Sequence, residues 1–297
     1  MNNSQTHEPL FSVVIPTYNY ADYIRSAIDS VLAQTEECEV IVIDDGSTDN
    51  TRDVVAEYAG KIKYIYQENK GVSAARNNGV SVSSGQYILF LDADDCLLND
   101  ALSKIKGQVL SYPETDCFIA GRISIDPLGR KKTTIPPLLS NHRTDNFKNF
   151  LRKKLGSSNI AAVKRHVFKR IIFPESINNN EDIVLLAHIL ACYKCRSIQQ
   201  PIIEVHQHEL SLRHNIQSVM DSTYKVIDEL FNSKILSEEF MSIKKEISSR
   251  ILLSKSRSLY LSGRKQEARQ LYRKAISLYP NNIFRLSYLK KYIKSFF

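Results

Sequence analysis

The sequence predicts an α/β fold in which a mostly parallel sheet is flanked by helices and followed by an α-helical C-terminal region. Two observations predict it. Short apolar runs alternate with helical patterns over the first 110 residues, and the chain from about residue 215 onward has a helical pattern with few breakers. Alternation of strands and helices is typical of a parallel sheet with helices on its faces.

Four apolar runs in the first 110 residues are the expected strands. They are short, rich in β-branched or aromatic residues and nearly continuous in apolar residues, as strands buried on both faces are. We expect strands at residues 11–16, 39–45, 62–67 and 86–95, and helices between them at 21–34, 47–59 and 71–83. This order implies right-handed crossovers between parallel strands.

The rest of the chain divides into a less regular middle and a helical end. We expect a hairpin strand at 116–126, helices at 146–155 and 180–194, and an extended segment at 195–207. Residues 263–280 carry small residues and a proline at spacings that resemble the second half of a tetratricopeptide repeat. We therefore expect one domain over residues 1–215 and a basic α-helical extension with a tetratricopeptide-like hairpin over 216–297.

Charge is distributed unevenly along the 297 residues. The net charge is +8, but residues 1–110 hold 8 basic and 16 acidic residues (−8), and residues 111–297 hold 32 and 16 (+16). Residues 244–297 alone hold 14 basic and 2 acidic residues (+12). This split predicts an acidic, metal-binding head and a basic tail that binds an anionic partner. Nucleic acid is not expected as that partner, because no recognition motif is present and the positive charge lies away from the acidic residues.

The sequence shows no recognisable targeting signal, and its cysteine usage favours a reducing cytoplasm. No apolar run approaches the ~20 residues needed to span a bilayer, and the first residues do not resemble a secretory signal. The five cysteines are scattered and odd in number. Cys192 and Cys195 form a CxxC motif, but no second pair completes a zinc site, so we expect a buried or merely reduced thiol pair.

The fourth expected strand ends in "LDADD", with Asp92, Asp94 and Asp95 within four positions. Asp92 and Asp94 would point the same way if the strand continued. Carboxylates this close together need a cation or a proton to neutralise them, and Mg²⁺ or Mn²⁺ bound by one or two carboxylates and phosphate oxygens suits the spacing. The alternative is that Asp95 or Asn99 caps the following helix.

Unusual residues also follow the other expected strands. Ligands of open parallel sheets bind beyond the carboxyl ends of the strands, so these residues should converge on one crevice. They are Thr17 to Asn19, Asp44 and Asp45, Asn69 with Lys70, and Asp92 to Asp95.

Together these motifs resemble, in order, those of the inverting family-two glycosyltransferases, which have the nucleotide-diphosphosugar-binding GT-A fold. The resemblance covers roughly residues 10–215. It rests on "VVIPTYN" (13–19), "VIVIDDGSTD" (40–49), "NKGVSAARNNG" (69–79), "FLDADD" (90–95), "NEDIVL" (180–185) and "HQHELSLRHN" (206–215).

The resemblance implies a nucleotide-sugar site at the strand ends. The first strand end and Asp44 or Asp45 would bind the base, Arg76 would lie near the phosphates or ribose, Asp92 would approach the ribose, and Asp94 would bind the metal. The implied nucleotide-sugar residues are Pro16, Thr17, Tyr18, Asn19, Asp44, Asp45, Asn69, Arg76, Asp92 and Ala93, and the implied metal residues are Asp94, Asp92 and His208.

Each of these assignments has a plainer alternative. The segment from Asp45 to Ser47 could be only a turn into a capped helix, and both interpretations can hold together. Arg76 could be a solvated charge on a helix, and His208 a surface or packed residue.

Transfer to an acceptor hydroxyl also needs a base. The resemblance implies that Asp182 is the catalytic base and that Glu181 is its acceptor-side neighbour, with Mn²⁺ or Mg²⁺ as cofactor. The alternative is that these acidic residues only stabilise the N-terminus of a helix.

The expected function is therefore inverting transfer of a sugar from a nucleotide-diphosphosugar, a UDP-sugar, to a glycan or lipid-linked acceptor in the synthesis of surface polysaccharide or lipopolysaccharide. Residues 283–297 could form an amphipathic helix that binds an anionic membrane surface on the inner face of the cell membrane, or an ordinary helix packed on the enzyme.

Two other functions stay open: a non-catalytic binding or scaffold protein that acts through the tail, and a nucleotidyltransferase. A nucleotidyltransferase should have a glycine-rich, arginine-bearing loop after the first strand, where this chain has "PTYNYADY".

Overall fold

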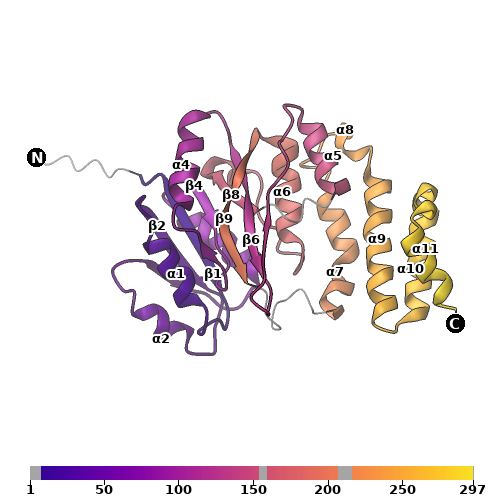
Figure 1. The fold of residues 1–297 in the computed structure, drawn as a ribbon, viewed down its shortest axis with the longest axis horizontal. Coiled ribbons are helices and arrows are strands. Elements are labelled where there is room, and N and C mark those ends of the chain that lie inside the picture. The colour runs from indigo at the N-terminus through magenta and orange to yellow at the C-terminus, as the bar shows by residue number, and fades with distance from the viewer. Residues whose placement is uncertain (1–7, 154–158, 207–215, 297) are drawn as a thin grey trace, which may run out of the picture.

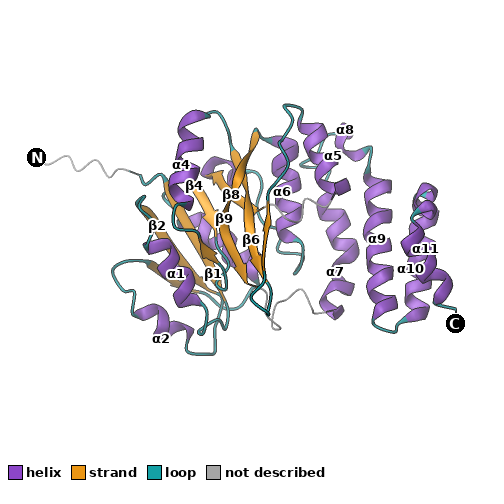
Figure 2. Cartoon of the chain, viewed as in Figure 1, coloured by secondary structure: helices purple, strands orange, loops and turns teal. Residues whose placement is uncertain are grey.

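The computed structural model describes residues 8–153, 159–206 and 216–296. A central sheet with helices on both faces occupies one end of the elongated molecule, and a row of C-terminal helices extends from it (Figures 1 and 2). Within the described residues, nine strands form one sheet in the order β3-β2-β1-β4-β8-β6-β9-β5, with β7 paired to β6.

The parallel half of the sheet matches the sequence prediction. It contains β1 (Phe11–Thr17), β2 (Cys38–Asp44), β3 (Lys63–Tyr66) and β4 (Tyr87–Phe90), and all their pairings with one another are parallel. The helices between them are α1 (Ile24–Leu32), α2 (Thr51–Ala56) and α3 (Val72–Val82). The four strands and three helices are confirmed.

The predicted end of the fourth strand was wrong. We expected the fourth strand to run to Asp95, but β4 ends at Phe90. Leu91 still donates its N–H to Val14 (3.0 Å), and the chain then turns, with the N–H of Asp95 donating to the carbonyl of Asp92 (3.0 Å). The acidic residues therefore lie in a turn after the strand and not within the strand.

The second half of the sheet is mostly antiparallel. Its strands are β5 (Cys96–Leu97), β6 (Cys117–Ile125), β7 (Lys131–Thr134), β8 (Asn159–Lys164) and β9 (Cys195–His206). The helical segments are α4 (Ala101–Ser111), α5 (Arg143–Lys153), η1 (Arg165–Lys169) and α6 (Glu181–Cys192). The predicted hairpin strand, two helices and extended segment are all present. We did not expect β5, β7 or β8, since no apolar pattern marked these segments as strands.

The core lies on both faces of the sheet. Successive residues of β1 alternate between the faces, so Val14 packs with α3, α5 and α6, whereas Val13 and Ile15 pack with α1 and α4. At Gly79 in α3, a Cβ atom would lie 2.3 Å from Val14 Cγ1. The close approach of α3 to β1 therefore requires glycine at this position.

The helical C-terminal region is confirmed. It consists of α7 (Ile216–Leu230), α8 (Glu238–Met241), α9 (Lys244–Leu261), α10 (Lys265–Leu278), η3 (Pro280–Phe284) and α11 (Leu286–Lys294). Side chains near the end of α7 share one core with α6. No helix in the described ranges has both the length and the apolar composition needed to cross a membrane.

Small residues line the contact between α9 and α10. Ala268 and Ala275 are buried, and they lie one heptad apart on α10. Their carbonyl groups accept hydrogen bonds of 2.7 Å from the hydroxyls of Ser256 and Ser249 on α9. The two helices thus approach closely. The division of the chain at residue 215 stays a prediction, since the core continues from α6 into α7.

Candidate functional site

The loops after β1 and β2 are connected by hydrogen bonds. Asn19 has a left-handed backbone (φ 58°), and its side-chain oxygen accepts hydrogen bonds from the N–H groups of Thr48 (2.7 Å) and Asp49 (3.3 Å). The N–H of Asn19 in turn donates to the hydroxyl of Ser47 (3.0 Å). Asparagine tolerates this backbone region better than most residues, so its place at the strand end has a structural reason.

Asp44 and Asp45 are buried, and their carboxylates accept hydrogen bonds that stabilise the surrounding loops. Asp44 accepts hydrogen bonds from the Ser47 N–H (2.8 Å) and the Tyr64 hydroxyl (2.7 Å). Burial and this carboxylate raise the pKa of Tyr64. Asp45 accepts from the N–H groups of Lys70 (2.9 Å) and Gly71 (2.8 Å), which holds the loop that leads into α3. The turn in this segment is confirmed, but the N-cap of α2 is Asn50, which makes no side-chain cap hydrogen bond.

The other expected nucleotide contacts differ in accessibility. Pro16 and Thr17 at the end of β1 are buried, whereas Tyr18 and Asn69 are exposed. Ala93 is buried in the turn from Asp92 to Asp95, which we call the acidic turn. Which of them contact a nucleotide stays a prediction.

The acidic turn brings three carboxylates together. One oxygen from each of Asp92, Asp94 and Asp95 lies within 4.8 Å of the others. His206, the last residue of β9, fixes the turn: its N–H donates to Asp95 Oδ1 (3.1 Å), and its Nδ1 lies 3.2 Å from the Asp94 carbonyl. Three hard oxygen donors at this spacing fit Mg²⁺ or Mn²⁺. Asp95 does not cap α4, whose N-cap is Asp100.

Tyr20 lies close to the same turn. Burial, followed by the carboxylates of Asp94 and Asp92, raises the pKa of Tyr20 to about 12. Its hydroxyl therefore stays protonated at neutral pH and can donate a hydrogen bond beside the acidic residues.

Arg76 joins the acidic turn to the start of α6. Its guanidinium group lies 2.7 Å from Asp92 and 2.8 Å from Glu181, and 5.1 Å above the ring of Phe173. Burial alone would lower the pKa of Arg76, but the two carboxylates outweigh it and raise the pKa. Arg76 is only 8% exposed, so its interpretation as a solvated helix charge was wrong.

Asp182 lies in the first turn of α6, next to the paired Glu181. Its Oδ1 accepts a hydrogen bond from the Ile183 N–H (2.8 Å), so it also stabilises the helix start, as the alternative interpretation required. Asp182 is exposed, although nearby protein atoms partly desolvate its carboxyl group. This desolvation, with the charge of Glu181, raises the pKa of Asp182, and Arg76 opposes the rise.

Sequence reasoning named most of this cluster but missed some of its parts. Arg76, Asp92 and Glu181 come together, and Asp94 lies in the same acidic turn. Tyr20 and His206 were not among the expected site residues. A signal for Tyr20 was its position one residue after the first motif, and one for His206 was its place at the end of the last expected strand. His208 lies outside the described residues.

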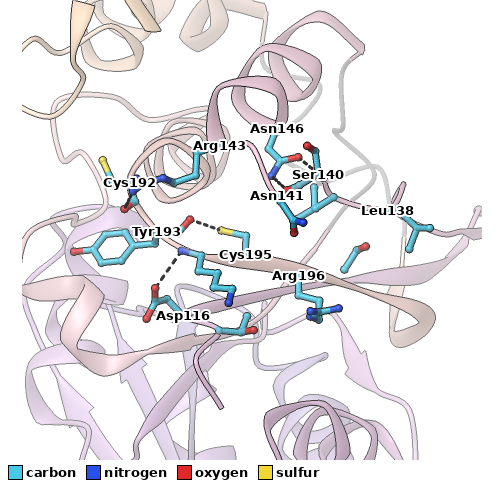
Figure 3. A pocket seen from close by; sticks show the side chains of 14 residues that line it. Asp116, Leu138, Ser140, Asn141, Arg143, Asn146, Cys192, Tyr193, Cys195 and Arg196 are labelled. Atoms are coloured by element: carbon cyan, nitrogen blue, oxygen red, sulfur yellow. Dashed lines mark hydrogen bonds between the residues drawn. The ribbon is translucent and has the colours of Figure 1, made fainter. Parts of the chain in front are cut away.

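A hollow of about 670 Å³ lies elsewhere, at the start of β9 and the end of α6 (Figure 3). Arg143 lines it and donates to the carbonyl of Cys192 (2.8 Å). Cys192 and Cys195 are free thiols, and Cys195 donates to the Tyr193 carbonyl (3.6 Å). A hydrogen bond with Cys117 and burial raise the pKa of Cys195, so the thiol is protonated. This hollow lies at the opposite end of β9 from His206 and takes no part in the acidic site.

Comparison with known proteins identifies relatives over nearly the whole chain. The model of the family described as "Glycosyl transferase family 2" matches residues 12–172. An uncharacterised glycosyltransferase of Rickettsia felis is 29% identical over 282 residues, which are 93% of this chain and 44% of that protein. One of Rickettsia conorii is 30% identical over 277 residues, 91% of this chain and 44% of that protein. This chain thus spans less than half the length of either relative.

Solved structures share the fold. Residues 1–349 of TarS from Staphylococcus aureus, in complex with UDP-GlcNAc, superpose with a TM-score of 0.67 at 20% identity, over 96% of this chain and 88% of that one. The mannosyltransferase PcManGT from Pyrobaculum calidifontis, in complex with GDP-Man and Mn²⁺, gives a TM-score of 0.53 at 19% identity, over 98% and 86%. The fold expected from the sequence motifs, GT-A, is confirmed.

Proposed function

Because this chain belongs to glycosyl transferase family 2, we propose that it transfers a sugar from a UDP-sugar to a hydroxyl group of a glycan or lipid-linked acceptor, with inversion at the anomeric carbon. One observation carries the proposal. The carboxylates of the acidic turn lie within 4.8 Å of one another, and Arg76 connects the turn to Glu181, the neighbour of Asp182. The proposed cation site and the proposed base thus belong to one hydrogen-bonded cluster.

Asp94 and Asp92 would hold Mn²⁺ or Mg²⁺, with Asp95 beside them and His208 as a further ligand. Such an ion supplies positive charge against the oxygens of a diphosphate. Arg76 donates a hydrogen bond to Asp92 (2.7 Å), and the N–H of His206 donates one to Asp95 (3.1 Å), so both carboxylates are held in position. The Mn²⁺ complex of the mannosyltransferase supports this proposal by analogy.

The nucleotide would bind across the loops after β1 and β2. Pro16, Thr17, Tyr18 and Asn19 follow one strand, Asp44 and Asp45 the next, and Asn69 and Ala93 border the same edge. Asp44 and Asp45 already accept protein hydrogen bonds, and each carboxylate can accept about four, so a ring N–H of uracil can add to them. The UDP-GlcNAc complex of TarS supports a uracil nucleotide.

Asp182 would act as the base. Its carboxylate accepts the proton of the acceptor hydroxyl while that oxygen bonds to the anomeric carbon, on the face opposite the diphosphate. The bond to the diphosphate breaks, and its electron pair leaves with the nucleotide. General base catalysis of this kind contributes roughly 10²–10⁴-fold. The raised pKa of Asp182 makes its carboxylate a better proton acceptor. Glu181, which Arg76 holds, would lie beside the acceptor.

We place this reaction in surface polysaccharide or lipopolysaccharide synthesis, in the cytoplasm and at the inner face of the cell membrane. TuaG of Bacillus subtilis, whose name assigns it provisionally to teichuronic acid biosynthesis, is 42% identical over 102 residues, 33% of this chain and 40% of that protein. The basic C-terminal helices would bring the enzyme to a lipid-linked acceptor.

The test is hydrolysis of a panel of UDP-, GDP- and dTDP-sugars, with Mn²⁺, with Mg²⁺ and with a chelator, measured as released nucleotide. We expect release from one or more UDP-sugars in the presence of the metal, and loss of release with the chelator. Product made with an acceptor glycan should carry the opposite anomeric configuration from the donor, as read by NMR. Release of inorganic pyrophosphate instead of a nucleoside diphosphate would identify a nucleotidyltransferase and overturn the proposal.

A further inference from the structure

We propose that one face of α11 is a docking surface for the phosphate headgroups of an anionic lipid membrane. This face comprises Lys290, Lys291 and Lys294 with Ser287 and the neighbouring Tyr260 of α9, which together line a hollow of about 410 Å³. The proposal rests on the proposed function only in that a membrane-linked acceptor would explain why the enzyme binds a membrane. Membrane binding itself does not depend on catalysis.

The charge of this face is not neutralised within its own segment. Residues 244–297 contain only two acidic residues, Glu246 and Glu267. Glu246 pairs with Arg152 at 2.7 Å, and Glu267 pairs with Arg264 at 2.6 Å. Over the part of the chain that the structure describes, no carboxylate lies within ion-pair distance of the three lysines. Three lysines that line one hollow with no carboxylate beside them favour an anionic partner.

Apolar side chains border the lysines. Leu286, Lys290 and Ile293 follow the i, i+4, i+7 spacing, so they form one strip along α11, next to the strip that carries Lys294. Three large apolar side chains are exposed close together here: Phe284 (80%), Leu286 (64%) and Ile293 (51%). A basic face with an exposed apolar edge fits the boundary between lipid headgroups and acyl chains.

The opposite face of α11 is already used for packing. Tyr288, Leu289 and Tyr292 pack against α9 and α10, and the ring of Tyr292 stacks on Tyr272 with centroids 4.2 Å apart. From the sequence, residues 283–297 could form either a membrane-binding amphipathic helix or a helix packed on the enzyme, and the tyrosines follow the second interpretation. The structure places them inward, so the surface that remains is the lysine face with its apolar edge.

An anionic membrane explains these features better than another partner. A small free phosphate would account for the lysines but not for the exposed Phe284 and Ile293. Lysines near an anionic bilayer attract it independently of sequence, and the apolar edge adds salt-resistant affinity.

The experiment is co-sedimentation of the full chain with vesicles of phosphatidylcholine alone or mixed with phosphatidylglycerol, at low and high salt. We expect binding only to the mixed vesicles. Lys290→Gln with Lys294→Gln should lower the partition coefficient about 30-fold, the factor that two lysines near an anionic surface usually contribute. The matched control, Lys61→Gln with Lys169→Gln, removes the same charge from exposed sites elsewhere and should change binding far less.

The apolar edge has its own test. Phe284→Ser with Ile293→Ser should remove the fraction of binding that survives high salt, whereas Leu110→Ser with Leu128→Ser, at equally exposed sites elsewhere, should not. Equal loss in the lysine variant and its control would overturn the proposal. So would equal binding to both kinds of vesicle, or loss of duplex DNA binding in the lysine variant with vesicle binding unchanged.

The outcome is separable from that of the proposed reaction. The lysine variant should release nucleotide from a UDP-sugar in solution at the rate of the unaltered protein. Vesicle binding without nucleotide release would support the docking surface and contradict the proposed function. Nucleotide release without vesicle binding would support the proposed function and contradict the docking surface.

Discussion

Asp92 and Glu181, far apart in the sequence, are held by the same guanidinium group, that of Arg76, at 2.7 and 2.8 Å. This arrangement fixes the acidic turn after β4 relative to the first turn of α6. Asp94 lies two residues after Asp92, and Asp182 follows Glu181, so one buried arginine connects the proposed cation site with the proposed base. The positions of both therefore depend on a residue that need not contact the substrate.

Arg76→Met should destabilise the fold strongly. It leaves Glu181 as a nearly buried carboxylate without a partner, a change that typically costs about 3–5 kcal/mol, with the lower part of that range expected here because Asp92 is half exposed. Urea denaturation measures the effect. Arg25→Met, which breaks the exposed pair with Glu57, is the control and should destabilise the protein far less, because solvent screens this pair. Similar losses in the two variants would mean that the Arg76 bridge contributes no more than a surface pair.

Asp94→Ala should remove metal-dependent turnover and weaken Mn²⁺ binding, because the acidic turn loses one of its three oxygen donors. Calorimetric titration with Mn²⁺ measures the binding, and released nucleotide measures the turnover. Asp100→Ala removes an exposed carboxylate a few positions further along the chain and serves as control. If Asp94→Ala bound Mn²⁺ as tightly as the unaltered protein, the ion would lie elsewhere.

Asp182→Asn should abolish transfer while it raises the melting temperature. The amide cannot accept the proton, so a loss of roughly 10²–10⁴-fold is expected. The pKa of Asp182 is raised in the fold, so its ionised form destabilises the native state at pH values above that pKa, and the neutral amide relieves this cost. Differential scanning calorimetry at pH 7 checks the shift, with exposed Asp228→Asn as control. Substantial turnover by Asp182→Asn would show that another group is the base.

The rate of transfer should fall on acidification at a higher pH than an ordinary aspartate would give. A base must be deprotonated, and the raised pKa of Asp182 keeps its proton bound to higher pH, so the acid limb of kcat/KM moves upward. Arg76 opposes the rise, so Arg76→Met, if it folds, should move the limb further up. A limb at the ordinary aspartate pKa in both proteins would contradict the assignment.

Gly79→Ala should destabilise the protein by about 1–3 kcal/mol, because the added Cβ would lie 2.3 Å from Val14 and force α3 away from β1. Gly107 offers the matched control. It lies within α4, and the space that an added Cβ would occupy is open, so Gly107→Ala should instead stabilise by about 0.5–1 kcal/mol. Chemical denaturation of both variants measures the difference, and two effects of the same sign would contradict the packing argument.

Part of the site could be read from the sequence because its residues sit at the ends of strongly patterned elements. The acidic triplet ends an apolar run, and Asp182 opens an apolar helix, so both stand out locally. The partners of these residues do not. Tyr64 contacts Asp44 at 2.7 Å and His206 contacts the acidic turn, but no spacing in the chain links either pair.

The end of β4 is another feature that the sequence alone did not predict. The apolar run predicted a strand, yet only the interactions beyond Phe90 decide where it stops, and these include the turn between Asp92 and Asp95. The short strands β5 and β8 exist because neighbouring strands supply their hydrogen-bond partners, and no local pattern requires them.

The sequence by itself determined the alternating order of the first four strands and three helices, the basic helical tail and the acidic residues at the strand ends. Periodicity, breakers and charge are properties of neighbouring residues, so they can be read along the chain. Only the tertiary structure decided that Arg76 is buried between Asp92 and Glu181, and that the lysines of α11 face outward while its tyrosines face inward. Those outcomes depend on which distant segments pack together and displace water, and local patterns do not carry that information.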